Sequence, residues 1–186
     1  MLTTKTRKCR ACGNPFTQYQ SFVTWCSPEC GAEIAAKKVA KIKAEEAVKV
    51  RRADKVTREK LKSRSAWARE AQAAFNAWVR ARDADRPCIS CGRHHNGQYH
   101  AGHYLSVGAR PELRYEPLNV WKQCAPCNTH LSGNVALYRG ALIWKLGAEK
   151  VDWLEGPHEP KKYTVDDLKA IKAKYTALTR ELKEKA

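Results

Sequence analysis

The spacing of eight cysteines constrains the fold of this chain more than any other feature of its sequence. They form four close pairs, Cys9-x2-Cys12, Cys26-x3-Cys30, Cys88-x2-Cys91 and Cys124-x2-Cys127. Two thiolates separated by two or three residues can turn toward one ion, and two such pairs make a closed tetrahedral zinc site. Disulfides are the alternative, but they belong to secreted proteins, and no signal-peptide segment precedes the first pair. We therefore expect two structural Zn²⁺ ions, one for each quartet.

The charge of the chain points to a polyanionic partner. The sequence holds 35 Lys and Arg against 19 Asp and Glu, a formal net charge of +16. Nucleic acid is the usual reason for such an excess, because each neutralised phosphate releases condensed counterions. A membrane surface would also attract the charge, but no apolar run is long enough to span a bilayer. We expect a soluble, cytoplasmic protein that binds DNA and no membrane.

The N-terminal segment, residues 1–34, has the pattern of a compact zinc module. Ser27 followed by Pro28 is typical of an N-cap and the first position of a helix, which places Cys30 in the first helical turn. A module this short buries too little apolar surface to fold alone. The metal must therefore supply much of its stability.

A basic connector follows over residues 35–64. Residues 35–70 hold 13 Lys and Arg, 5 acidic residues and no Gly or Pro, and large apolar residues are sparse. The segment favours a helix that has no apolar stripe to face a core. It is either a solvated linker or an arm that tracks DNA, and the two roles are compatible. The candidate DNA contacts in it are Lys37, Lys41, Arg51 and Arg52.

Two amphipathic helices are predicted on either side of the remaining cysteines. The first begins near Ser65 in the segment 65–156, carries an apolar face suited to a core, and ends by Pro87. The second occupies the segment 157–186 and starts at Thr164, with Asp167 completing a capping box. The apolar residues at helical spacing are Trp67, Ala71, Ala74, Phe75 and Trp78 in the first, and Leu168, Ile171, Tyr175, Leu178 and Leu182 in the second. The second set makes a short heptad seam, for which packing on its own chain is favoured over a homodimer.

Three residues between and beside the second cysteine pairs suggest catalysis. His103 lies in a Gly-His-Tyr run, Asn119 precedes Cys124 by five residues, and Asn128 directly follows Cys127. This pattern resembles the HNH, or ββα-metal, nucleases. The resemblance implies an α+β fold: a small zinc-braced, treble-clef-like core, here with long helices and an N-terminal zinc knuckle.

Phosphodiester cleavage explains why these residue types are needed. It requires a general base for water and a divalent cation that stabilises the phosphate and its leaving oxygen. We assign His103 as the base and Asn128, through its side-chain oxygen, as a ligand of one Mg²⁺ or Mn²⁺ ion. Asn119 is expected to hydrogen-bond the loop that fixes His103.

The metal site departs from the family pattern at one position. Many relatives carry an Asp immediately before the catalytic His, and position 102 here is Gly. His100 is the nearest replacement ligand, although an ideal strand would point His100 and His103 to opposite faces. His130 lies two residues after Asn128, roughly 200° around a helix, and suits a phosphate contact better than the same ion.

Four cations flank this centre and could contact DNA whether or not the protein is catalytic: Arg110, Arg114, Lys122 and Arg139. A zinc module that binds nucleic acid or protein without catalysis would use the same basic surface. Such a module has no need of a base and an oxygen ligand at these spacings. An HNH nuclease that cuts simple duplex DNA is excluded by no residue.

A more specific resemblance includes the N-terminal zinc module, the basic connector and the HNH-like segment, in this order along the chain. The runs FNAWVRARDADRPCISCG, HAGHY and QCAPCNTHLSGN, with the N-terminal CRACGNPF and WCSPEC and the lysine-rich connector, resemble the phage NinG (Rap) recombination endonucleases. The resemblance covers nearly the whole chain. It implies a bacteriophage endonuclease of the infected host's cytoplasm that cleaves Holliday junctions and D-loops, with phage or host recombination proteins as possible partners.

Overall fold

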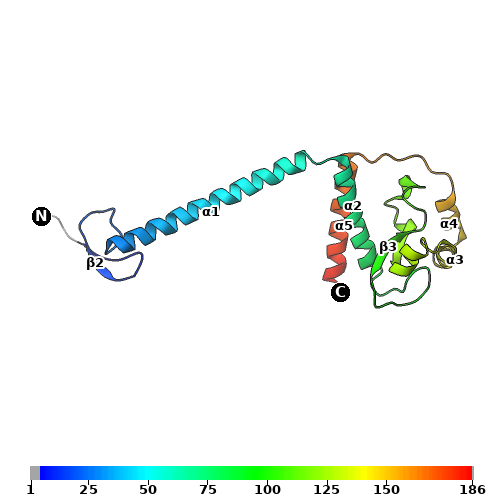
Figure 1. Ribbon diagram of the computed structural model, residues 1–186, viewed down its shortest axis with the longest axis horizontal. Coiled ribbons are helices and arrows are strands. Elements are labelled where there is room, and N and C mark those ends of the chain that lie inside the picture. The colour runs from blue at the N-terminus through cyan, green and yellow to red at the C-terminus, as the bar shows by residue number, and fades with distance from the viewer. Residues whose placement is uncertain (1–4, 186) are drawn as a thin grey trace. The chain divides into compact units, whose positions relative to one another are not determined.

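The computed structural model describes residues 5–185 and divides into two compact units, one ending at residue 61 and the other beginning at residue 62 (Figure 1). Across residues 5–185, none of the helices combines the length and apolarity that a membrane crossing requires.

The N-terminal unit is a short hairpin that carries the first cysteine quartet, followed by one helix. Strand β1 (Lys5–Lys8) pairs antiparallel with β2 (Pro15–Gln18), and the knuckle between them closes at Gly13, whose φ of +77° is a conformation that L side chains rarely adopt. Helix α1 (Pro28–Lys60) starts as predicted, because the Ser27 side chain accepts a hydrogen bond from the Cys30 amide. The cap thereby fixes Cys30 in the first turn.

Helix α1 has no core of its own. None of its residues is buried, and Figure 1 shows it as one uninterrupted helix. This confirms the prediction of a basic helix without a core-facing stripe. Its stability rests on propensity, the Ser27 cap and local ion pairs such as Lys37–Glu33 at 2.6 Å.

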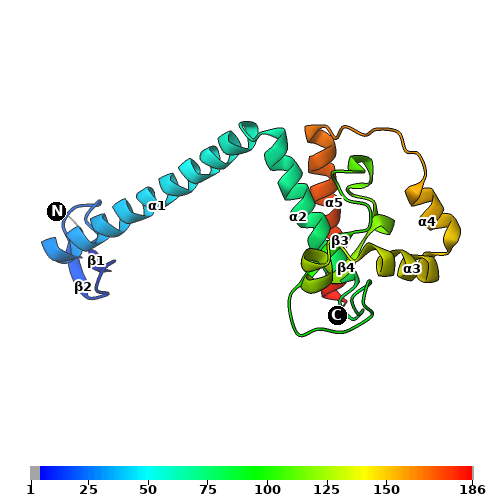
Figure 2. The same ribbon diagram turned by 45° about the vertical axis from the view of Figure 1, so that its right-hand side comes forward.

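The C-terminal unit is built on a pair of helices, α2 (Arg64–Arg82) and α5 (Val165–Glu184), which lie side by side in Figures 1 and 2. Both predicted apolar faces meet here: Trp67, Ala71 and Phe75 of α2 are buried with Leu168 and Tyr175 of α5. The seam of α5 therefore packs on its own chain, as favoured from the sequence. The predicted capping box of Thr164 and Asp167 is also confirmed.

Helix α2 ends at Arg82, five residues before the proline predicted to limit it. The cause is Asp83, a buried residue whose carboxylate pairs with Arg82 at 2.7 Å and with Arg86 at 3.3 Å. Its Oδ2 also accepts a hydrogen bond from the Lys122 amide at 3.2 Å. Asp83 thus leaves the helix to fasten it to strand β4 (Val120–Cys124).

We expect Asp83→Ala to destabilise the C-terminal unit by about 3–5 kcal/mol, because it removes the carboxylate partner of two cations and of a buried backbone amide. Chemical denaturation followed by circular dichroism measures this loss. Asp85→Ala is the matched control, since Asp85 is exposed and should change stability by less than about 0.5 kcal/mol. Equal stability of the two variants would contradict the fastening role.

A hairpin and two short helices form the second core. Strand β3 (Tyr99–His103) pairs antiparallel with β4, and α3 (Val135–Leu146) and α4 (Ala148–Glu155) follow. Tyr104 and Trp121, beside and on the hairpin, are buried together with Tyr138 and Leu142 of α3. The hairpin therefore lies between two cores, since Val120 on its other face joins the α2–α5 cluster. This placement holds the strands rigidly, which a site built on them requires.

Candidate functional site

Both cysteine quartets assemble as the spacing predicts. In each, the four sulfur atoms lie within 4.8 Å of one another, a donor set that could hold a tetrahedral zinc ion. All eight cysteines are free thiols, so no disulfide competes with this reading. In the N-terminal unit, Cys9 is the one cysteine that is buried.

The second quartet joins three parts of the C-terminal unit. Cys88 and Cys91 lie in the loop after α2, Cys124 ends β4, and Cys127 lies in the π-helical turn Pro126–His130. A zinc ion there would tie the loop and the hairpin to the turn that carries Asn128. His95 adds a contact that we did not predict: its Nε2 lies 3.2 Å from the sulfur of Cys91. Its position four residues after that cysteine was the signal available in the sequence.

His103 is held in one tautomer. Its Nε2 lies 3.0 Å from the carbonyl oxygen of Arg114. A carbonyl only accepts, so Nε2 must carry the proton and Nδ1 is left as the basic nitrogen. Burial lowers the pKa of His103 below its ordinary value of 6.5, and the nearby Arg114 charge acts in the same direction. The ring is therefore neutral at physiological pH, as a general base must be.

Asn119 closes the loop that leads to Arg114. The side chain is fully buried, and its Nδ2 donates to the carbonyl oxygens of Leu105 and Leu113 at 3.0 and 3.2 Å. Its Oδ1 accepts from the Leu105 amide at 2.8 Å. These contacts fix both ends of the loop whose last carbonyl orients His103, which is the geometry that the predicted loop-bracing role requires.

Asn128 lies beside His100, not beside His103. Asn128 Nδ2 is 2.9 Å from His100 Nδ1. The pairing of β3 is regular from Tyr99 to His103, so His100 and His103 belong to opposite faces of the hairpin, as an ideal strand predicts. Within residues 5–185, no hydrogen bond joins His103 to either side chain. His130, at the end of the same turn, is exposed.

The four cations predicted around the centre are engaged within the protein. Arg110 pairs with Glu112 at 2.7 Å and also donates to the Gly156 carbonyl. Arg114 donates to the side chain of Gln72 at 2.7 Å. Their two companions behave similarly: Lys122 is buried with its ammonium on the Ala84 carbonyl, and Arg139 pairs with Glu155. A phosphate contact through any of them would have to displace or share these partners.

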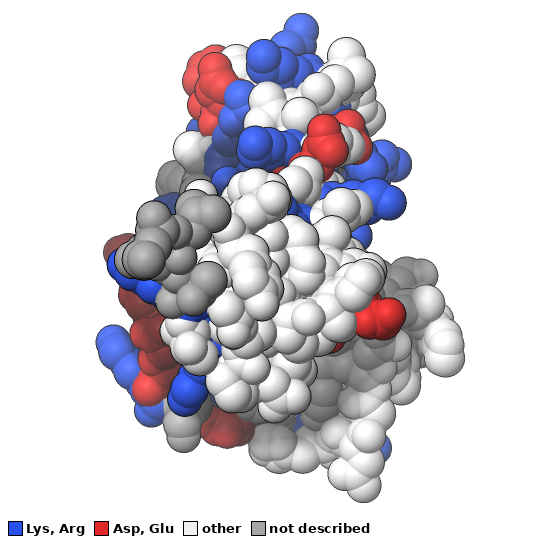
Figure 3. Space-filling view, turned by 90° about the vertical axis from the view of Figure 1, so that its left-hand side faces the viewer, with Lys and Arg blue, Asp and Glu red and all other residues white. Residues whose placement is uncertain are grey.

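The predicted contacts on α1 are, by contrast, exposed: Lys37, Lys41, Arg51 and Arg52. The knuckle in front of that helix differs in character, since residues 11–28 contain no Lys, Arg, Asp or Glu. Figure 3 faces this module, and uncharged residues dominate the centre of that face. The charged residues of the N-terminal unit therefore lie on both sides of this uncharged stretch, with four cations in residues 5–10 before it and ten Lys and Arg against six acidic residues in α1.

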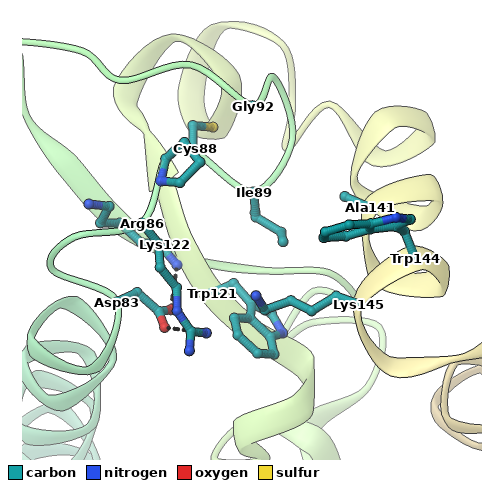
Figure 4. Close-up of a pocket in the computed structure, with 11 residues that line it drawn as sticks. Asp83, Arg86, Cys88, Ile89, Gly92, Trp121, Lys122, Ala141, Trp144 and Lys145 are labelled. Carbon is teal, nitrogen blue, oxygen red and sulfur yellow. Dashed lines mark hydrogen bonds and ion pairs between the residues drawn. The ribbon is translucent and has the colours of Figure 1, made fainter.

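A pocket of about 450 Å³ lies between β4, α3 and the loop after α2 (Figure 4). Trp121 forms part of its wall, and the ammonium of Lys145 lies 4.9 Å from that ring. Trp144 stands on α3 with 89% of its surface exposed. Burial lowers the pKa of Lys145, and the nearby Arg86 charge lowers it further. No motif in the sequence predicts this combination of exposed indole and cations.

Comparison with known proteins gives one consistent family. The model of the family described as "Bacteriophage Lambda NinG protein" matches residues 1–185. The chain is 41% identical over 188 residues to Protein ninG of Escherichia phage 933W, covering 95% of this chain and 94% of that protein. It is 42% identical over 170 residues to Protein ninG of Escherichia phage lambda (86% and 83% covered) and 40% identical over 191 residues to that of Salmonella phage P22 (97% and 93%). No solved structure matches the chain.

Proposed function

We propose that this chain, which belongs to the phage NinG protein family, is a metal-dependent HNH-type endonuclease that cleaves branched recombination DNA. The observation that carries the proposal is the fixed His103 at the end of β3: a half-buried, neutral imidazole whose tautomer is set by the Arg114 carbonyl, which follows the loop that Asn119 braces. A module that only binds nucleic acid has no use for this arrangement. The branched substrate rests on the resemblance alone.

The residues divide the work of hydrolysis. His103 Nδ1 accepts a proton from water as the water oxygen bonds to phosphorus and the P–O bond to the leaving oxygen breaks, that oxygen taking a proton from solvent. A Mg²⁺ or Mn²⁺ ion, when bound, would stabilise the negative charge on the phosphate. Asn128 Oδ1 is the donor suited to such a hard ion, and His100 beside it is the second candidate, once it releases its contact with Asn128 Nδ2. These groups and His103 belong to opposite faces of β3, so one phosphate would meet both only across the end of the strand, where His103 is the last residue. The cations of α1 would hold the phosphate backbone.

A cleavage assay tests the function directly. Purified, zinc-loaded protein is incubated with a four-way junction, a D-loop and linear duplex of the same sequence, each with Mg²⁺, Mn²⁺ or EDTA. Metal-dependent nicking that favours the branched substrates is the expected result. Equal cutting of linear duplex would support a simple duplex nuclease, and binding without cutting would support the non-catalytic module. Because paired nicks across a junction need two active sites, the mass of the protein–junction complex should be measured alongside.

We further expect Trp144→Ala to weaken DNA binding by about 5- to 150-fold, because stacking of an exposed base on an aromatic ring contributes about 1–3 kcal/mol. Unpaired bases occur at branch points, so the loss should be larger for a D-loop than for linear duplex. Fluorescence anisotropy with labelled DNA at fixed salt measures both. Trp153→Ala is the control, since Trp153 packs on His158 and lies outside the pocket. Identical losses on all DNA forms would argue against base stacking.

A further inference from the structure

Gln123 has a side chain whose orientation is fixed by its neighbours. The residue is fully buried on β4, and its Nε2 donates to Ser90 Oγ at 2.7 Å and to the Gly133 carbonyl oxygen at 2.5 Å. Because a carbonyl oxygen cannot donate, the amide nitrogen has to face Gly133. The Oε1 atom must therefore point the other way.

That oxygen has no hydrogen-bond partner within the described residues. Leaving a buried amide oxygen unpaired costs free energy, so we expect this oxygen to have a partner such as an ion or a water molecule in the functional protein. Gln123 pairs with His100 across the hairpin, so Oε1 belongs to the same face of the sheet as His100 and Gly102. It does not belong to the face of His103.

The unpaired oxygen lies against the backbone of Gly102, in the place that a side chain at that position would fill. A Cβ atom added to Gly102 would lie 2.1 Å from Gln123 Oε1 and 3.0 Å from Asn128 Oδ1. Two carbonyl oxygens thus converge above the Gly102 backbone. The contact between Asn128 Nδ2 and His100 Nδ1 turns the Asn128 oxygen toward that space. Any side chain at position 102, an aspartate included, would collide with the Gln123 carboxamide.

We propose that Gln123 Oε1 and Asn128 Oδ1 together bind a divalent cation, with Gln123 supplying from β4 the oxygen ligand that position 102 lacks. Its catalytic meaning rests on the proposed function. Carboxamide oxygens suit a hard ion such as Mg²⁺ or Mn²⁺. Two protein ligands leave the other coordination positions of the ion to water and phosphate oxygens, which Mg²⁺ usually retains. Because neither ligand is charged, the free protein should bind the ion weakly and DNA phosphate should tighten it.

Mn²⁺ binding measures the site without any cleavage. Zinc-loaded protein is titrated with Mn²⁺ in the absence of DNA, and free Mn²⁺ is followed by electron paramagnetic resonance. Gln123→Met and Gly102→Ala should each weaken binding at least tenfold. Ser90→Ala removes a hydrogen bond from the same carboxamide but spares Oε1, and Gly97→Ala adds a methyl group in open space. Both controls should bind within about threefold of the wild type.

The wild-type protein gives a second readout that does not depend on the folding of a variant. In ¹⁵N-labelled protein, sub-stoichiometric Mn²⁺ should broaden the side-chain amide signals of Gln123 and Asn128 before those of other Asn and Gln residues. Absence of selective broadening, or wild-type affinity in a folded Gln123→Met, would overturn the assignment. Mn²⁺ bound at this site without DNA cleavage would instead leave the assignment standing and reject the nuclease. Cleavage by a protein that fails the Mn²⁺ tests would do the reverse.

Discussion

Loss of zinc from the second quartet is expected to unfold the C-terminal unit. Cys88, Cys91, Cys124 and Cys127 join a loop, a strand and a turn, and three of the four are buried. Structural zinc contributes about 10–16 kcal/mol in small zinc peptides, which equals or exceeds the whole stability of a typical domain. Cys124→Ser should therefore abolish zinc binding at this quartet and cooperative unfolding of the unit, as measured by metal analysis and thermal circular dichroism.

The N-terminal quartet provides the matched control. Cys12→Ser should release one zinc ion and melt the knuckle, yet leave the unfolding transition of the C-terminal unit unchanged, because contacts divide the chain between residues 61 and 62. If Cys124→Ser kept a cooperative transition like that of the wild type, zinc at the second quartet would not be what holds the hairpin to its turn.

Replacement of His103 by alanine is expected to lower the rate of DNA cleavage by about 10²- to 10⁴-fold, the usual contribution of a positioned general base. DNA affinity and zinc content should stay near wild type, because within residues 5–185 the ring makes a single hydrogen bond, to the Arg114 carbonyl. Single-turnover cleavage and anisotropy on the same junction measure the two effects. His94→Ala, on an exposed loop, is the control. A variant that cuts at the wild-type rate would remove His103 from the mechanism.

The pH dependence follows from the same environment. Burial lowers the pKa of His103 in the folded chain, so the neutral base persists below pH 6.5 and the acid limb of the rate profile should lie under that value. The unfolded chain takes up the proton at higher pH than the folded one. Stability from this group is therefore present above about pH 6.5 and decreases as the pH falls toward the folded pKa. His103→Ala should remove that part of the pH dependence of unfolding.

Most of the helical framework could be predicted because its signals are local. Ser27 and Thr164 are N-caps, and their short-range hydrogen bonds act wherever the helix packs. The apolar seam of α5 also followed from spacing. The exception is the end of α2, which depends on the hydrogen bond from the Lys122 amide to Asp83, a contact between segments 39 residues apart.

The candidate site was predictable in kind but not in arrangement. Residue type identified His103 and Asn119, yet only the structure shows that Arg114 contributes a carbonyl oxygen and that Lys122 is buried with its ammonium on Ala84. Charge in a sequence does not say whether a cation faces solvent or a backbone oxygen. The exposed Trp144 carried no local signal at all, because exposure is a property of the assembled surface.

The sequence by itself determined the two cysteine quartets, since thiolates at such short spacings have few other ways to be satisfied in a reduced chain. It also determined which residues could serve as base and brace. Only the tertiary structure decided which groups share a face of the hairpin: register places His100, Gly102 and Gln123 together and turns His103 away from them. Register is set by long-range packing on both faces of the sheet, and no local pattern encodes it fully.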